Sequence, residues 1–120
     1  MKRILPLSLL LFVILSFSFT SLQTNDRYFV QFKINSIETA EQAQHINKQM
    51  SLNSNIEASR ADYYTSTYFC YLTNGSNSSE EDFKIWFEKL GYKISCFNKG
   101  IETKDIGIEI DVLKNCTDEK

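Results

Sequence analysis

The chain of 120 residues contains few of the residues that build catalytic and metal sites: four glycines, one proline, one histidine and three cysteines. It has no Gly-rich phosphate loop and no Gly-x-Ser-x-Gly turn, so two common signs of an enzyme are absent. Its carboxylates form no spaced pair suited to glycoside hydrolysis or proton transfer. We therefore expect a protein that is not an enzyme, with no catalytic residue and no cofactor.

Basic residues are also too few and too scattered to form a surface for nucleic acid. Without Lys2 and Arg3, eleven basic residues remain against fifteen acidic ones, a formal charge of −4. Phosphate backbones are bound by clusters of Lys and Arg, which this chain lacks. We therefore expect no nucleic-acid partner, and the length is sufficient for one domain with a single core.

The first twenty residues have the pattern of an export signal. Lys2 and Arg3 precede an apolar run over 4–19, which contains no charged residue and is interrupted by Pro6 and several serines. This predicts a signal peptide at 1–20, cleaved near Thr20, followed by a short segment at 21–27. The mature protein would be periplasmic or secreted and would contact a membrane only through the signal peptide before cleavage.

A strand and a helix are predicted at the start of the mature chain. Aromatic and β-branched residues alternate with polar ones over 28–34, which is typical of a strand. Over 40–50, apolar residues recur at steps of three or four, which predicts a helix. Thr39 and Gln42 have the spacing of a capping box, so we expect them to start this helix.

A hairpin and a second helix follow. Extended segments at 56–64 and 67–73 are separated by two residues, which predicts antiparallel neighbours. Ser79 precedes three acidic residues, as expected for a helix N-cap, and Gly91 ends this helix. The apolar side of the helix is expected to lie in the core and comprises Phe83, Trp86, Phe87 and Leu90.

The remaining extended segments are at 93–97 and 106–112, and we expect them to be strands joined by a turn at 98–105. The order strand, helix, strand, strand, helix, strand indicates an α+β, ferredoxin-like sandwich. Its antiparallel sheet would carry both helices on one face and gain an added C-terminal strand. The ferredoxin-like domain would span 28–98, with a C-terminal extension at 99–120.

The stretch from Tyr28 to Cys96 resembles the heavy-metal-associated domain of copper chaperones and metal-pumping ATPases. In that family, the first strand leads into a Gly-Met-x-Cys-x-x-Cys loop, and an Ile follows four residues later. Ile46 matches that Ile, which sets Thr39 and Gln42 at the positions of the two metal-binding cysteines.

The same alignment places Ser36 and Ile37 at the Gly-Met pair, and Gly91 and Tyr92 match the family's Gly-Tyr end of the closing helix. The resemblance implies a ferredoxin-like fold. Because both thiolates are replaced, a soft cation such as Cu(I) has no reason to prefer this loop, and we expect no metal there.

A second resemblance covers nearly the same residues. The segments 28–31 and 40–43 are similar to the opening of SPOR domains, exported modules that bind the glycan strands of peptidoglycan. This resemblance implies a cell-wall ligand on the sheet face that carries the outward side chains of Gln31 and Lys33.

Cys70, Cys96 and Cys116 are twenty or more residues apart, which excludes the Cys-x-x-Cys pair of metal and redox sites. One interpretation is that they are buried thiols, because free Cys packs as a small apolar residue. In the expected sheet, Cys70 and Cys96 would be about 9 to 10 Å apart, too far for a disulfide. Cys96 with Cys116 is the more favourable disulfide, because the tail could fold back.

His45 is expected on the surface of the first helix, away from its apolar side. An enzyme with Cys70 or Cys96 as nucleophile is a minor hypothesis, because His45 lies on a different element. Our main hypothesis is a small exported binding or interaction module that resembles a heavy-metal-associated domain, with an unidentified protein or cell-envelope partner. The alternatives are a SPOR-like peptidoglycan-binding module and residual metal handling through relocated cysteines.

Overall fold

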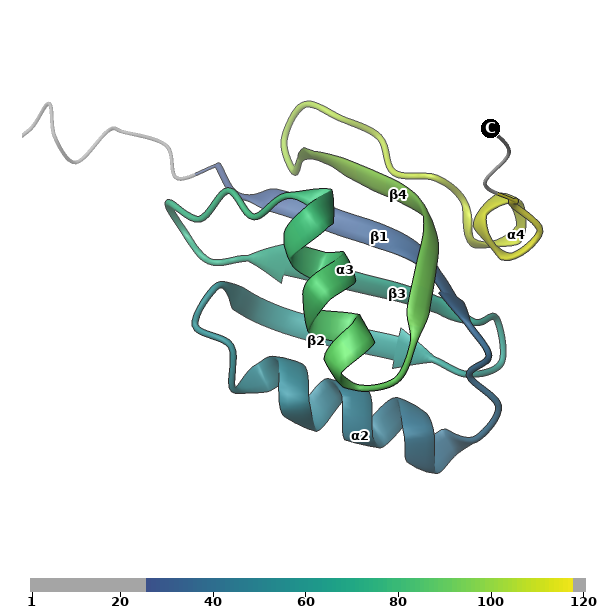
Figure 1. The fold of residues 1–120 in the computed structure, drawn as a ribbon. Coiled ribbons are helices and arrows are strands. Elements are labelled where there is room, and N and C mark those ends of the chain that lie inside the picture. Colours follow the sequence, from purple (N-terminus) through teal and green to yellow (C-terminus); the bar gives the residue numbers. More distant parts are fainter. Residues whose placement is uncertain (1–25, 118–120) are drawn as a thin grey trace, which may run out of the picture.

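The structure is a computed structural model, and it describes residues 26–117. The predicted signal peptide at 1–20 lies outside the described residues. The strands and helices, drawn in Figure 1, are β1 (Tyr28–Asn35), α2 (Ala40–Ser51), β2 (Ile56–Asp62), β3 (Thr67–Leu72), α3 (Glu80–Lys89), β4 (Lys93–Ile101) and α4 (Ile110–Lys114). Within this part of the chain, no helix has the length and apolar content needed to cross a membrane.

The sheet has four antiparallel strands in the order β2-β3-β1-β4, and α2 and α3 cover one of its faces (Figure 1). This is the ferredoxin-like arrangement, so the predicted fold class is confirmed. The helix-covered face buries alternate residues of the central strands, among them Val30, Phe32 and Ile34 of β1. We call the opposite face of the sheet the outer face.

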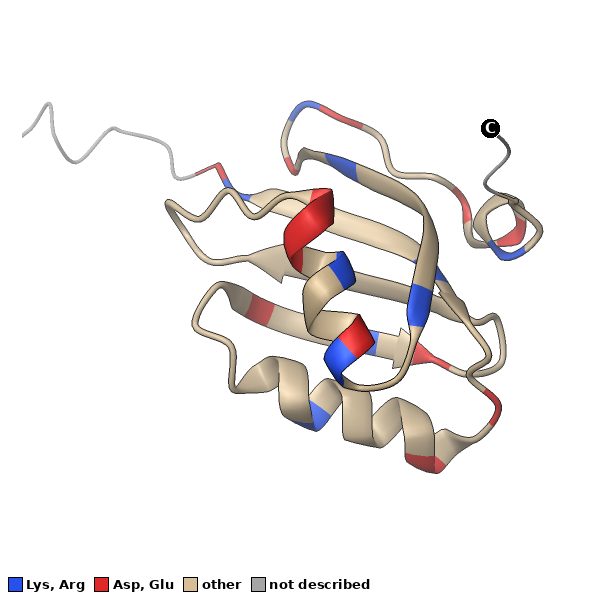
Figure 2. Cartoon of the chain, viewed as in Figure 1, with Lys and Arg blue, Asp and Glu red and all other residues tan. Residues whose placement is uncertain are grey.

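Helices α2 and α3 begin at the residues that the sequence indicated, and α2 extends one residue past its predicted end, to Ser51. Ser79 caps α3 with a full capping box, and its first turn carries the acidic residues grouped at the start of α3 in Figure 2. At the other end, Gly91 has a φ of 97°, and its N–H donates to the Glu88 carbonyl. The Tyr92 N–H donates to the Phe87 carbonyl, which completes a Schellman motif.

Aromatic rings fill the space between the sheet and the helices. Phe32 has no exposed surface, and its ring centroid lies 5.0 Å from those of Tyr68 and Phe87 and 5.7 Å from that of Phe83. Edge-to-face pairs at these distances stabilise beyond their buried area. Trp86 is partly buried against the same cluster, so the prediction that the aromatic stripe of α3 belongs to the core is confirmed.

The predicted fifth strand at 106–112 is wrong. This segment forms no ladder with the sheet; Ile106 is 94% exposed, and the chain turns into α4 at Ile110. Strand β4 also continues to Ile101, beyond its predicted end at Phe97. The alternation of apolar residues indicated an extended backbone, but it did not show whether a neighbouring strand was available to pair with it. The tail instead crosses the outer face, because Cys116 is bonded to Cys96 in the middle of β4.

Candidate functional site

The loop before α2 occupies the place where the resemblance puts metal ligands, and its polar side chains are engaged in capping. The Thr39 hydroxyl accepts the Gln42 N–H at 3.1 Å. In return, the Gln42 side-chain oxygen accepts the backbone N–H groups of Thr39 at 3.1 Å and of Glu38 at 2.6 Å. The predicted capping box is therefore confirmed, and it stabilises the helix by satisfying N–H groups that have no partner inside it.

The backbone of this loop is held by two neighbouring residues. Ser36 takes a φ of 70°, in the left-handed region, and Ile37 is 5% exposed and belongs to the core cluster. In the described residues, no group of three or more His, Cys, Asp or Glu side chains could hold a metal ion. The arrangement is suited to starting a helix, and the side-chain oxygens of Thr39 and Gln42 already accept backbone N–H groups.

Cys70 lies on β3 in the core, on the face that packs against the helices. It is a free thiol with no exposed surface, and burial raises its pKa to about 12. A thiol with such a high pKa is protonated at neutral pH, whereas nucleophiles and metal ligands use the thiolate. His45 is exposed on α2, as expected, so the structure does not bring it together with a buried thiol.

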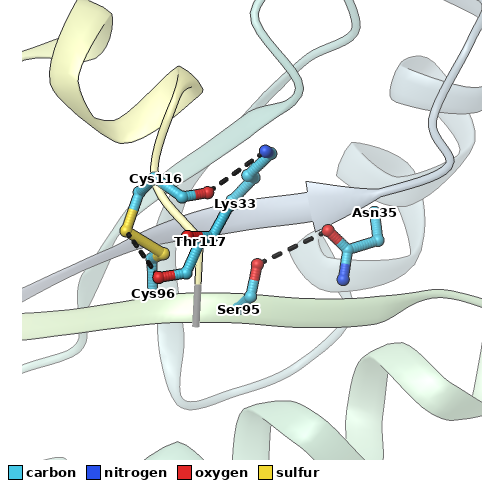
Figure 3. Close-up of a disulfide and its surroundings, with 6 residues drawn as sticks. All are labelled: Lys33, Asn35, Ser95, Cys96, Cys116 and Thr117. Carbon is cyan, nitrogen blue, oxygen red and sulfur yellow. Dashed lines mark hydrogen bonds between the residues drawn. A yellow bond between two sulfur atoms is a disulfide. The ribbon is translucent and has the colours of Figure 1, made fainter. Parts of the chain in front are cut away.

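Cys96 and Cys116 are joined by a disulfide, with Cα atoms 6.4 Å apart (Figure 3). This is the pair that the sequence made the more favourable one. Cys96 has a φ of 58° and lies where the register between β1 and β4 shifts. Two residues of β4, Cys96 and Phe97, oppose the single residue Phe32 there, which is the geometry of a β-bulge.

The outer face carries the side chains of Gln31 and Lys33, which we predicted to point away from the helices. Both are bonded to the tail, so this face is covered where the second resemblance placed a glycan. The Gln31 side-chain oxygen accepts the Ile108 N–H at 2.5 Å, and its amide donates to the Ile108 carbonyl at 3.1 Å. The Lys33 ammonium donates to the Cys116 carbonyl at 3.2 Å (Figure 3).

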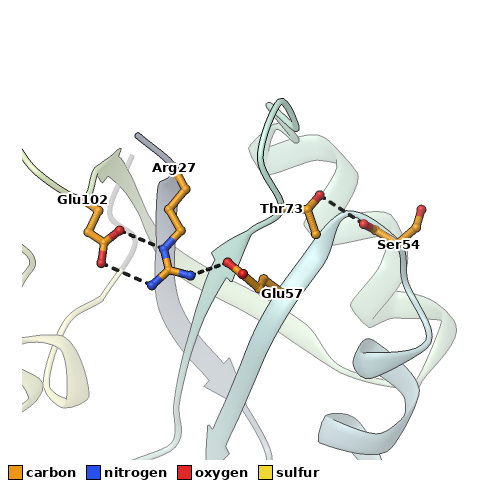
Figure 4. Close-up of polar contacts among 5 residues, drawn as sticks. All are labelled: Arg27, Ser54, Glu57, Thr73 and Glu102. Carbon is orange, nitrogen blue, oxygen red and sulfur yellow. Dashed lines mark hydrogen bonds and ion pairs between the residues drawn. The ribbon is translucent and has the colours of Figure 1, made fainter. Parts of the chain in front are cut away.

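A charged cluster at one end of the outer face is a feature that the sequence analysis missed. The Arg27 guanidinium donates to both carboxylate oxygens of Glu102 and also to Glu57 (Figure 4). Its central carbon lies 3.8 Å from the centre of the Tyr71 ring. The guanidinium lowers the pKa of Glu102, and the two carboxylates raise the pKa of Arg27. These residues lie on different elements, so no spacing in the sequence signals the cluster.

Among solved structures, one that is similar is the N-terminal domain of a potential copper-translocating P-type ATPase from Bacillus subtilis, determined in the Cu(I)-loaded state. The match has a TM-score of 0.50 and 24% identity, and it covers 57% of this chain and 84% of that one. The chain has a fold like that of heavy-metal-associated domains. No protein-family model matches the sequence, and no curated protein matches at a significant level.

The likeness covers little more than half of the chain, and at this identity it shows the fold alone. Residues 102–117, which cross the outer face, form an addition to the four strands and two helices of the ferredoxin-like frame. Two surface hollows flank the added segment. One of about 180 Å³ is lined by Phe29, Phe69 and Tyr71, and the other, of about 290 Å³, also includes Phe69.

Proposed function

We propose that this chain is a small exported module that binds a protein or cell-envelope partner, and that it uses a fold like that of heavy-metal-associated domains without their metal site. The observation that supports this proposal most is the loop before α2. The resemblance aligns Thr39 and Gln42 with the ligand positions, and their oxygen atoms accept backbone N–H groups in a capping box. A Cu(I) ion prefers thiolate or thioether ligands, which these side chains do not provide.

The three cysteines support the same view. Cys70 is buried with a raised pKa, and Cys96 is bonded to Cys116. A disulfide sulfur is not a thiolate, and a buried protonated thiol would have to lose its proton and reach solvent to bind a metal. Metal handling through relocated cysteines would therefore require both reduction and a change in packing.

A glycan-binding role through the outer face is not included in this proposal. Gln31 is 3% exposed and holds Ile108, and the Lys33 ammonium is bonded to the backbone of Cys116. A polysaccharide on this face would first have to displace the C-terminal segment.

The proposal that the metal site has been lost is tested by rebuilding it. In the double variant Thr39→Cys/Gln42→Cys, two thiols would stand at the aligned ligand positions. We expect this variant to bind one Cu(I) in competition with a chromophoric chelator, under ascorbate rather than a thiol reductant, whereas the wild-type chain does not compete. The matched control is Glu41→Cys/Gln44→Cys, which has the same spacing on the same helix but is out of frame.

Two results would count against the proposal. Stoichiometric Cu(I) binding by the wild-type chain would mean that a metal site is present. Failure of the in-frame variant to exceed the control would mean that the alignment through Ile46 is wrong. Export is tested separately, by expressing the full chain and measuring the mass of the protein recovered outside the cytoplasm. A mature N-terminus at Ser21 is expected.

A further inference from the structure

Part of the outer face of the sheet is apolar and lies under a cover. It carries the rings of Phe29, Phe69 and Tyr71, with 6.0 Å between the ring centroids of Phe29 and Phe69 and 5.1 Å between those of Phe69 and Tyr71. Phe29 is only 5% exposed, although it points away from the core cluster beneath the helices. Residues 102–117, which we call the strap, supply this cover.

The first half of the strap is fitted closely to β1 and β4. Asp105 accepts the Ile101 N–H at 2.7 Å, and Ile108 is clamped on both its N–H and its carbonyl by Gln31. Gly107 lies against Gln31 so closely that an added Cβ would be 2.9 Å from the side-chain oxygen. An added side chain here would push the Gln31 oxygen away from its position and disturb the clamp on Ile108.

The second half of the strap is held by fewer interactions. Helix α4 has five residues and no side-chain hydrogen bond at its N-cap, and a helix of that length is not stable alone in water. Leu113 is fully buried, while Ile110 and Val112 are 44% and 60% exposed. Besides the packing of Leu113, this half is held by the Lys33 bond to the Cys116 carbonyl and by the disulfide.

We propose that the Cys96–Cys116 disulfide is a redox latch, which holds the strap on the outer face when oxidised and lets it lift away when reduced. Opening would uncover Phe69, Tyr71 and the seat of Leu113 while the four-stranded sheet and its two helices stay folded. The latch would be closed in an oxidising compartment, which agrees with the exported location proposed above.

The chemical step is thiol–disulfide exchange with a dithiol. One thiolate of the dithiol attacks the Cys116 sulfur, forms a mixed disulfide, and releases Cys96 as a thiolate that takes up a proton. The second thiol of the reductant then attacks the mixed disulfide and releases the Cys116 thiol. Two electrons pass from the dithiol, which becomes a disulfide. Cys116 is the expected point of attack, because it is half-buried whereas Cys96 is 9% exposed on β4.

The test is hydrogen–deuterium exchange of the oxidised mature chain, before and after treatment with dithiothreitol. On reduction we expect the amides of Ile108 and Leu113 to exchange at least about tenfold faster than before, while those of β1 and β3 remain protected and exchange far more slowly than the strap, because the sheet stays folded. In parallel, the fluorescence of the dye ANS should rise, since it binds exposed apolar surface.

The control is Cys116→Ser, which removes the latch and alters no residue of the four strands. It should show fast strap exchange from the start and no further response to dithiothreitol. The proposal is overturned if the strap of the reduced protein stays as protected as before, because the strap is then a permanent part of the core. It is equally overturned if the sheet loses its protection together with the strap, because the disulfide is then a staple of the whole fold.

Discussion

The helix side and the outer side of the sheet both bury aromatic rings, but in different ways. The helix side is a packed core, whereas on the outer side a single segment of chain covers the rings. On the helix side, Phe32 packs against three rings within 5.7 Å, and two capped helices close over it. On the outer side, one strap with a five-residue helix lies over the sheet, with hollows beside Phe69. Packing holds the helix side together, whereas the strap on the outer side is also held by the disulfide at Cys116.

This difference teaches that added segments on a common fold can be held by a few specific bonds instead of by a second core. Gln31 shows how this works, because it is a polar residue on a central strand and yet is 3% exposed. Its side chain bonds Ile108 and also accepts from the Asn98 amide at 2.9 Å, so its oxygen is satisfied by two donors. A buried amide with these bonds fixes the position of the strap without apolar packing.

The largest expected effect comes from the helix side. Phe32→Ala should lower the free energy of unfolding by about 3–5 kcal/mol, because it leaves a cavity among rings that cannot collapse onto it. Phe69→Ala, on the outer face, should have a clearly smaller effect because Phe69 is half-buried. Urea unfolding of both variants measures the difference. Equal losses would mean that the outer face is as tightly packed as the core.

The disulfide should have the next largest effect. Cys116→Ser should lower the free energy of unfolding by about 3 kcal/mol, because a sequence separation of 20 residues is no longer constrained in the unfolded chain. The reduced wild-type chain is the comparison and should have the same stability as the variant. If reduction leaves the urea midpoint unchanged, the disulfide contributes nothing to the fold.

The two sides of the sheet also differ in how far the sequence predicted them. Periodicity and capping signals located both helices and four strands, because each signal is local and each element buries its own apolar side. The strap was misread as a strand. The alternation of Ile106, Ile108 and Ile110 records an extended backbone, but the partner of that backbone is the side chain of Gln31, 77 residues away.

The site was predicted unevenly for the same reason. Thr39 and Gln42 were interpreted correctly as a capping box because their bonds join residues three apart. Arg27 was overlooked because its partners, Glu57 and Glu102, are 30 and 75 residues away. The pairing of Cys96 with Cys116 was the one long-range signal in the sequence, and with it the path of the tail across the sheet could have been inferred.

The clamp at Gln31 gives a smaller effect on the outer side. Gln31→Leu should lower the free energy of unfolding by about 1–2 kcal/mol, because the Ile108 N–H and carbonyl lose their partner. The control is Gln44→Leu, at an exposed position of α2, where little change is expected. Chemical denaturation of both variants in the oxidised state checks this. A stable Gln31→Leu protein would mean that the strap is positioned by the disulfide and Leu113 alone.

A cap on the helix side should have a comparable but slightly smaller effect. Thr39→Ala should cost about 1 kcal/mol, because the Gln42 N–H loses its acceptor at the start of α2. Thr39→Ser keeps the hydroxyl and should restore most of the stability. If both variants unfold with the same free energy as the wild type, the Thr39 hydroxyl makes no contribution to starting α2.

The smallest effect concerns the charges at the end of the outer face. The Arg27 guanidinium lowers the pKa of Glu102 in the folded protein, so the stabilisation from this pair is present at neutral pH. It is lost as the pH falls from the ordinary glutamate pKa of about 4.3 through the lower folded value. Glu102→Gln should therefore have a lower melting temperature than the wild type at pH 7, and this gap should close on acidification.

Glu88→Gln, on the exposed side of α3, is the control. A gap that stays constant with pH would mean that the carboxylate acts through its hydrogen-bond geometry and not through its charge. Because the pair is exposed to solvent and screened by salt, the same gap should also shrink in high salt, which a buried contact of the helix side would not do.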